Sequence, residues 1–320
     1  MGEISIMVTV RPYCDDYKLL WDGFVEKSKN GSFLFYRDYM DYHADRFKDY
    51  SLLVYDAKER LLAVMPANIV LAENKVYSHG GLTFGGFLAA EDMTTEKMLD
   101  VFSAVRAFLK ANNIRTLVYK CIPYIYHRYP AEEDRYALFV NDAKLTRRDV
   151  STSIYLANRY PYQERRKRAV KKAERENIIV MPSEEYDEYW DVLTGNLATH
   201  HDTRPVHSLQ EIKLLAQRFA NNIKLYVAKK AENIVAGMLI FENYHVAHAQ
   251  YLASSEEGRS AGALDLVVNY LITEIYRDKT YFDFGISNEQ QGRFLNTGLI
   301  AQKEGFGARA IVHDFYELDI

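Results

Sequence analysis

The sequence predicts an α+β protein of two similar domains, each a mixed, mostly antiparallel sheet flanked by helices. The chain has 320 residues, which is enough for about two domains of ordinary size. The hydrophobic periodicity gives one order of elements twice, β-α-α-β-β-β-α-β-α-β. Three consecutive strands followed by a helix and a further strand favour a mixed sheet over a doubly wound parallel one.

The first half carries the first copy of this pattern. Its predicted strands are 4–10, 51–55, 61–71, 75–78, 116–121 and 150–156, and its predicted helices are 15–29, 37–46, 94–112 and 137–142. The helix over 94–112 is the clearest, because Met98, Phe102, Val105 and Leu109 recur at helical spacing.

The second half repeats the order. Its predicted strands are 178–181, 224–228, 234–242, 246–254, 281–284 and 310–316, and its predicted helices are 162–177, 184–198, 209–219, 261–276 and 289–303. Asn158 and Pro161 interrupt the periodicity between the halves, so we place the domains at residues 1–158 and 159–320. One large α+β domain is the alternative.

Composition excludes several classes of protein. The net charge of −4 argues against a broad nucleic-acid-binding surface and against DNA as a partner. Two cysteines, Cys14 and Cys121, exclude a disulfide scaffold and a cysteine-rich zinc module. The N-terminus lacks a signal-peptide pattern, and the apolar stretch 61–72 is too short to span a bilayer. We therefore expect a cytoplasmic protein; action at the inner face of the membrane, on a lipid-linked substrate, is the alternative.

The repeated element order resembles the GNAT acyltransferase fold, and its doubling resembles the Fem-type (FemABX) transferases of peptidoglycan and related envelope-biosynthesis acyltransferases. The most specific stretches are Phe282–Ser287, Leu295–Leu299 and Lys303–Gly307; Gln302 departs from the pattern because Fem-type proteins have Phe there. The resemblance implies transfer of an acyl or aminoacyl group to an amine of a peptidoglycan or polysaccharide precursor. It implies acyl-CoA or aminoacyl-tRNA as the donor substrate, with no tightly bound cofactor.

Acyl transfer to an amine requires a polarised carbonyl, a proton acceptor and close positioning of both substrates. In the GNAT fold these groups gather where the fourth and fifth strands separate, here between 246–254 and 281–284. The candidates at this separation are His248, Gln250, Tyr251 and Asp283, and the catalytic candidates just beyond it are Glu289 and Lys303. Lys303 would stabilise the oxyanion or hold a donor phosphate, and Glu289 would act as a general base. Packing or surface roles are the alternatives.

Two segments are candidates for binding phosphates. Residues 259–264 resemble the GNAT phosphate loop, with Arg259, Ser260 and Gly262 as donor contacts, although Leu264 replaces its last small residue. Between residues 159 and 175 there are eight Lys or Arg and two Glu, a local charge of +6. This excess predicts a polyanion partner: an acceptor pyrophosphate, a tRNA backbone or anionic lipid head groups. Arg165 and Arg166 are its candidate contacts, and an ordinary solvated helix is the alternative.

Two loops are candidates for the acceptor. His200, His201, Arg204 and His207 connect two helices of the second half, where a GNAT fold covers the acceptor. Their spacing is not that of a zinc site, so we expect no metal. In the first half, His79 and Gly80 begin a glycine-rich loop; the resemblance implies that it lines the cleft between domains, and a tight hairpin is the alternative.

Two rival functions remain at this stage. The first is an acetyl-CoA-dependent N-acetyltransferase of an amino sugar or small amine. The second is a non-catalytic binding protein on a degenerate GNAT scaffold, which the departures at Leu264 and Gln302 favour.

Overall fold

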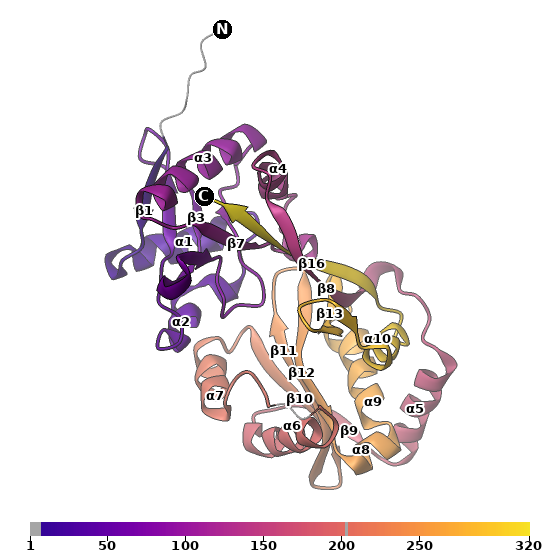
Figure 1. Ribbon diagram of the computed structural model, residues 1–320. Helices are drawn as coiled ribbons and strands as arrows, with labels where there is room; N and C mark the ends of the chain where they lie inside the picture. The colour runs from indigo at the N-terminus through magenta and orange to yellow at the C-terminus, as the bar shows by residue number, and fades with distance from the viewer. Residues whose placement is uncertain (1–7, 202–203) are drawn as a thin grey trace. The chain divides into compact units, whose positions relative to one another are not determined.

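The structure, a computed structural model, describes residues 8–201 and 204–320. The chain forms two compact units (Figure 1). The first extends to Asp149 and includes residues 291–293 and 312–320, and the second comprises Val150–Gln290 and Phe294–Ile311. We expected a single boundary between residues 158 and 159. The division differs because two long strands, β8 (Lys144–Tyr155) and β16 (Arg309–Asp319), each contribute residues to both units.

The first unit contains two sheets and a central helix. Its strands are β1 (Thr9–Pro12), β2 (Leu52–Tyr55), β3 (Leu61–Met65), β4 (Asn68–Val70), β5 (Lys75–Tyr77), β6 (Leu88–Ala89) and β7 (Thr116–Lys120), and its helices are α1 (Lys18–Lys27), α2 (Arg37–Met40), α3 (Thr95–Ala111) and α4 (Glu133–Val140). One sheet has the order β1-β2-β3-β6; in the other, β4 pairs with β5, β5 with β7 and β7 with β16. The apolar face of α3 packs into the core.

Local chemistry explains where this unit departs from the predicted elements. The strand expected over 61–71 is divided at Pro66, which has no N–H to donate, and β3 and β4 join different sheets. The helix expected over 37–46 ends at Met40 and continues only as a 3₁₀ turn. The first strand begins at Thr9, and the part of it expected before residue 8 lies outside the described residues.

The second unit is a six-stranded mixed sheet flanked by helices. Beside β8 its strands are β9 (Ile179–Ser183), β10 (Ile223–Lys230), β11 (Asn233–Glu242), β12 (Val246–Ser254) and β13 (Tyr281–Ile286), and its helices are α5 (Glu164–Arg175), α6 (Tyr186–His201), α7 (Leu209–Arg218), α8 (Glu256–Ala261), α9 (Ala263–Tyr270) and α10 (Thr297–Glu304). The order is β8-β13-β12-β11-β10-β9, antiparallel except for β12–β13. The predicted mixed, mostly antiparallel sheet is confirmed.

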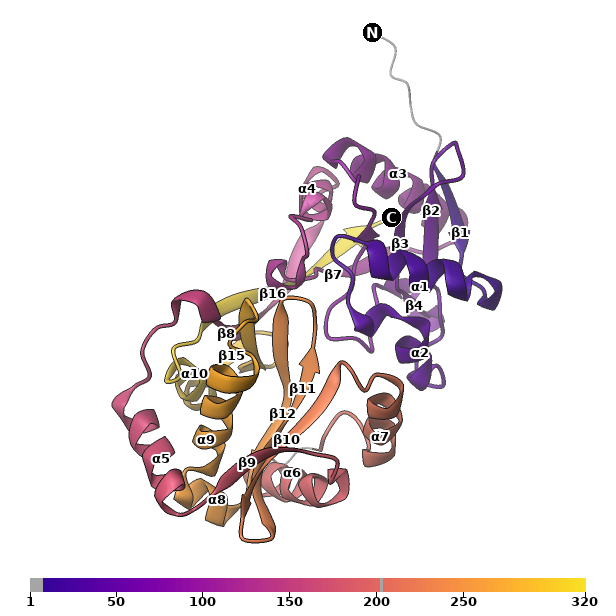
Figure 2. The ribbon, with the colours of Figure 1, turned by 180° about the vertical axis from the view of Figure 1, so that it is seen from behind.

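The two faces of this sheet are covered by different helices (Figure 2). Helices α5 and α9 pack on one face, where Phe282 and Phe284 of β13 join the core, and helices α6 and α7 cover the other. Neighbouring side chains of a strand point to opposite faces. Asp283, which lies between the two phenylalanines, therefore points to the face of α6 and α7.

The segment after β12 differs most from the predicted helices. The helix expected over 261–276 is broken at Gly262, whose φ of +83° permits the turn between α8 and α9. The first half of the helix expected over 289–303 is wrong. A hairpin, β14 (Asn288–Glu289) and β15 (Phe294–Leu295), stands there, turning through residues 290–292, which have positive φ. Helix α10 starts only after Asn296, whose side chain accepts a hydrogen bond from the Leu299 N–H.

Candidate active site

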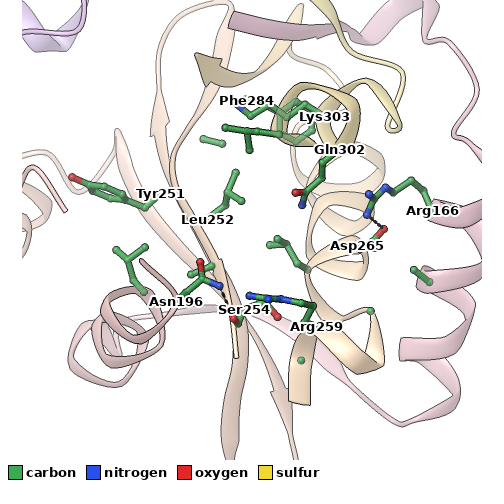
Figure 3. A pocket seen from close by; sticks show the side chains of 18 of the residues that line it. Arg166, Asn196, Tyr251, Leu252, Ser254, Arg259, Asp265, Phe284, Gln302 and Lys303 are labelled. Atoms are coloured by element: carbon green, nitrogen blue, oxygen red, sulfur yellow. Dashed lines mark hydrogen bonds and ion pairs between the residues drawn. The ribbon is translucent and has the colours of Figure 1, made fainter. Parts of the chain in front are cut away.

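A cavity opens where strands β12 and β13 separate. Their parallel pairing ends at His248 and Asp283. Beyond this point a cavity of about 690 Å³ is lined by residues 249–254 of β12, by Phe284 and by side chains from α5, α6, α9 and α10. Phe284 and Lys303 stand at one end, Arg259 at the other and Gln302 between them (Figure 3). The cavity thus lies at the strand separation that the resemblance implied.

Strand β12 presents backbone groups to this cavity. In the pairing of β12 with β11, Tyr251 lies opposite Leu239 and Ala249 lies opposite the next residue, Ile240. Gln250, between Ala249 and Tyr251, is therefore the extra residue of a β-bulge. The edge of β12 that faces the cavity has lost its pairing with β13, which leaves N–H and C=O groups directed toward a ligand. Such N–H groups can stabilise the negative charge that develops on a reacting carbonyl oxygen.

Lys303 is buried at the cavity wall, although its position near the end of α10 suggested an exposed residue. Its side chain is 4% exposed, and its Nζ donates hydrogen bonds to the carbonyl oxygens of Gly285 (2.8 Å) and Ile286 (2.7 Å). Burial lowers the pKa of this amine to about 8, while the negative charge of Asp283 opposes that shift. An ammonium has three N–H donors. Two bind the strand carbonyls, which leaves one for a ligand.

His248 and Asp283 form a buried pair at the point of strand separation. The two residues are direct cross-strand partners, and His248 Nδ1 lies 2.7 Å from Asp283 Oδ2. The other oxygen of the carboxylate, Oδ1, accepts hydrogen bonds from the hydroxyls of Ser151 (2.6 Å) and Ser153 (2.5 Å) on β8. Asp283 is fully buried and His248 is 7% exposed. A carboxylate only accepts, so the imidazole carries its proton on Nδ1.

Tyr251 lines the cavity with its ring, but its hydroxyl points away from Lys303 (Figure 3). The hydroxyl accepts a hydrogen bond from the backbone N–H of His207 (3.2 Å) and lies 2.7 Å from Nδ1 of the same residue. Burial raises the pKa of Tyr251. His207 and Arg204 line a second cavity of about 560 Å³ beside α6 and α7. The side chains of His200 and His201 lie outside the described part of the structure.

The far end of the main cavity is cationic. Arg166 and Lys172 of α5 line it, together with Arg259 and Ser260 of α8 and with Gly262 at the N-terminus of α9. The Lys172 ammonium donates to the Ser260 carbonyl oxygen at 2.7 Å. A helix N-terminus beside three cations is favourable for a phosphate.

One carboxylate lies within this cationic end. Asp265, in the first turn of α9, accepts a hydrogen bond from Arg166 at 2.8 Å, and both side chains are largely buried. Burial raises the pKa of Asp265, although the nearby Arg166 opposes the shift. The pair fixes α5 against α9 and positions the Arg166 guanidinium at the cavity wall.

Helix α5 carries its charge on two faces. Arg166 and Lys172 point toward the cavity, whereas the side chains of Arg168, Lys171 and Arg175 are exposed to solvent. Arg165 is exposed as well and donates to the carbonyl oxygen of Ala301 at 3.0 Å. The cationic surface therefore continues outward from the cationic end of the cavity.

Glu289, His79 and Gly80 do not line the cavity, and His248 and Asp283 stand beside it without lining it. Glu289 stands on the β14–β15 hairpin rather than on a helix, and accepts a hydrogen bond from the Asn296 side chain at 3.1 Å. His79 and Gly80 belong to the first unit. There the ring of His79 stacks on His43 with 5.2 Å between centroids, and the Gly80 N–H donates to the Asn68 side chain at 2.6 Å.

The sequence candidates did not include several residues of the site. Asn196 lines the cavity from α6 and donates to the Ser254 carbonyl oxygen at 2.9 Å. Ser151 and Ser153 could have been found from the sequence. They alternate along one strand with Thr152 and Ile154, which predicts that the two serines share a face. Gln250 was a candidate at the strand separation, but its place in a bulge could not be predicted, because that depends on the pairing of two strands.

Neither a metal site nor a membrane span is found in the described residues. In residues 8–201 and 204–320, no group of three or more His, Cys, Asp and Glu is placed to hold a metal ion. Within the same part of the chain, no helix is both long and apolar enough to cross a bilayer.

Comparison with known proteins identifies the second unit. Residues 161–291 match the acetyltransferase (GNAT) domain. FemX is similar in structure, at 11% identity and a TM-score of 0.68 over 95% of this chain and 96% of that chain. So are L-PGS from Bacillus licheniformis (14% identity, TM-score 0.61, over 94% and 91%) and a tandem GNAT protein from the clavulanic acid biosynthesis pathway (9% identity, TM-score 0.52, over 98% and 98%). No curated protein sequence matches the chain. Residues 161–291 therefore have the GNAT fold, and the whole chain resembles FemX and a tandem GNAT protein in structure.

Proposed function

We propose that this protein transfers an acyl or aminoacyl group to an amine of a cell-envelope precursor, and that the cavity between β12 and β13 binds the donor. The observation that carries the proposal is the end of pairing at His248 and Asp283, which opens a cavity with Lys303 at one end and a cationic wall at the other. The donor phosphates lie at the cationic end, and the reacting carbonyl lies beside Lys303 and the edge of β12.

The proposed step conserves protons and electron pairs. His248 Nε2 takes a proton from the acceptor amine, whose lone pair attacks the donor carbonyl carbon. The carbonyl π pair moves onto oxygen, where the remaining N–H of Lys303 and the N–H groups of β12 stabilise it. The C=O bond then re-forms, and the bond to the leaving sulfur or oxygen breaks. The leaving group departs with that electron pair and takes the proton from the imidazolium.

The exposed face of α5 favours aminoacyl-tRNA as the donor. Coenzyme A would use the cationic end of the cavity, but it is too small to need a cationic surface that continues outward over Arg168, Lys171 and Arg175. A tRNA backbone would follow such a surface. The structural similarity to FemX and L-PGS supports an envelope component as the acceptor.

Paired charge variants test the donor assignment. In Arg168→Glu/Lys171→Glu, we expect aminoacyl-tRNA to bind at least about tenfold more weakly and with a smaller salt dependence. In Lys172→Ala/Arg259→Ala, every donor should bind more weakly. The control is Lys58→Glu/Lys110→Glu, which makes the same change in net charge on exposed residues of the first unit. If the control weakens tRNA binding as much, contact through α5 is refuted.

An acetyl-CoA-dependent N-acetyltransferase is the second candidate. The sequence Arg259-Ser260-Ala261-Gly262, which leads from the end of α8 into α9, favours it, because the N-terminus of α9 can bind the pyrophosphate. Sub-millimolar acetyl-CoA should then raise the melting temperature of the protein and leave Lys172→Ala/Arg259→Ala unchanged. Stabilisation by acetyl-CoA together with no binding of aminoacyl-tRNA would overturn the preferred donor. Failure of both donors to bind would favour a non-catalytic binding protein.

A further inference from the structure

A row of polar side chains crosses three neighbouring strands at the point where β12 and β13 separate. Ser153 of β8 is the cross-strand partner of Asp283 of β13, which is in turn the partner of His248 of β12. Ser151 lies two residues before Ser153 and so points to the same face of the sheet. Four polar side chains, all at most 7% exposed, therefore meet at one level of an otherwise apolar sheet.

The direction of these side chains follows from the strand alternation. Ala247 and Ala249 on β12, like Phe282 and Phe284 on β13, pack in the core beneath α9. The residues between them, His248 and Asp283, therefore point to the face that α6 and α7 cover. On β8, Ile154 belongs to the α9 face, so Thr152 shares that face, whereas Ser151 and Ser153 do not.

The hydrogen bonds in this row have a fixed direction. The Asp283 carboxylate can only accept, and it does so from two hydroxyls on Oδ1 and from the imidazole on Oδ2. A fully buried carboxylate is costly without donors, and three donors offset much of that cost. The proton of His248 is thereby held on Nδ1, and the lone pair stays on Nε2.

Gly285 leaves space beside the imidazole. A Cβ atom at this position would lie 3.4 Å from His248 Cε1 and 4.0 Å from Nε2, and the φ of +74° disfavours any side chain there. The carbonyl of the same residue binds Lys303 at the cavity wall. His248 is therefore separated from the Lys303 end of the cavity by a single residue that lacks a side chain.

We propose that Ser151 and Ser153 are positioning residues that hold the Asp283 carboxylate toward His248, so that Nε2 of the imidazole accepts the proton of the acceptor amine. The inference rests on the proposed acyl transfer and extends it to β8, which precedes residues 161–291 that match the GNAT domain. The acyltransferase site of the second unit is thus completed by a strand outside the matched domain.

The tautomer of His248 can be measured without any substrate. Long-range ¹H–¹⁵N correlation spectra of the full-length protein, labelled with ¹⁵N-histidine, distinguish a proton on Nδ1 from one on Nε2. His248→Gln assigns the signals of this ring. We expect the Nδ1–H form at pH 7 in the wild type. An Nε2–H form in the wild type would overturn the proposal outright.

Variants of β8 test the role of the two hydroxyls. In Ser151→Ala/Ser153→Ala the carboxylate loses both serine donors and is no longer held toward the ring, so we expect an Nε2–H population of His248 to appear at pH 7. Asp283, which accepts from the ring, and Lys303, which lies across Gly285, are not altered. Ser153→Thr, which keeps a hydroxyl, should retain the Nδ1–H form of the wild type.

Thr152→Val is the matched control, because Thr152 is buried on the same strand and points to the opposite face. It should leave the tautomer unchanged. If the serine variant keeps the wild-type tautomer, or if Thr152→Val changes it equally, the positioning role is refuted. Should the double variant not fold, Ser151→Ala and Ser153→Ala alone give the same test with smaller changes. A fixed tautomer in a protein that binds no acyl donor would refute the proposed function and leave the hydrogen-bond row intact.

Discussion

Lys303 shows how burial turns a common side chain into a candidate catalytic group. The protonated amine can stabilise an oxyanion, and its pKa of about 8 places deprotonation close to neutral pH. We therefore expect kcat to fall as pH rises through about 8. Lys303→Met should lower kcat by about 10²–10³ and remove this alkaline limb. Steady-state rates from pH 6 to 9.5 measure both effects, with circular dichroism as the check on folding. An unchanged alkaline limb in Lys303→Met would contradict the assignment.

His79, in the first unit, makes the stability of the protein depend on pH. Burial and the nearby charges of His43 and Lys120 lower its pKa to about 3, well below the unfolded value of about 6.5. The unfolded state therefore binds a proton that the folded state does not, and stability is lost as pH falls below about 6.5. Between pH 7.5 and 5 this loss is about 2 kcal/mol.

The comparison of wild type with His79→Gln isolates this contribution. The variant removes the titrating group, so its free energy of unfolding should fall about 2 kcal/mol less over the same pH range. Denaturant titrations at pH 7.5, 6.5 and 5 provide the measurement. Parallel losses in the two proteins would show that His79 does not sense the pH.

At the scale of elements, the junction of α8 and α9 depends on one glycine. A Cβ at Gly262 would lie 2.6 Å from the Ala169 carbonyl oxygen of α5, and its φ of +83° is unfavourable for any other residue. Gly262→Ala should therefore cost about 1–3 kcal/mol of stability and weaken donor binding, because α5 and α9 form the cationic end of the cavity.

Gly195 provides the opposite case on α6. Nothing lies within 4 Å of a Cβ at this position, and the backbone is helical. Gly195→Ala should stabilise the protein by about 0.5–1 kcal/mol and leave donor binding unchanged. Thermal unfolding and binding of acetyl-CoA or aminoacyl-tRNA by the two variants check both expectations. Equal effects of the two substitutions would show that the contact with Ala169 does not matter.

Elements with a strong periodicity were predictable, and those fixed by tertiary contacts were not. The helix α3 and the strands β10 to β12 follow from apolar spacing alone. The hairpin in place of a helix at residue 289 depends on positive φ at Gln290, Gln291 and Gly292, and the first two of these are not glycine. A lysine at the end of a helix gives no sign in the sequence that it will be buried. The carbonyl groups that bind Lys303 belong to strand β13, which is distant in sequence.

At the scale of the whole chain, each unit contains a parallel pair of strands in its described residues: β5–β7, connected through β6 and α3, and β12–β13, connected through α8 and α9. The two pairs end differently. Beyond β5, the Ser78 N–H donates to the Val118 carbonyl oxygen, and the Ser78 hydroxyl accepts from the Lys120 N–H, so the first pair stays connected. The second pair separates and encloses the cavity. A difference at the ends of two strands therefore opens, in the second unit, the cavity that we propose binds the donor.

The last prediction concerns where the second unit begins. A fragment starting at residue 159, the boundary expected from the sequence, lacks β8 and so exposes the edge of β13 and removes the buried Ile154 from the core. Exposed sheet edges favour aggregation, and loss of a buried isoleucine costs about 2–5 kcal/mol. We expect fragment 159–320 to aggregate or melt at least about 10 °C below fragment 144–320, which retains β8. Size-exclusion chromatography and thermal unfolding distinguish the two, and equal stability of the fragments would show that β8 is dispensable.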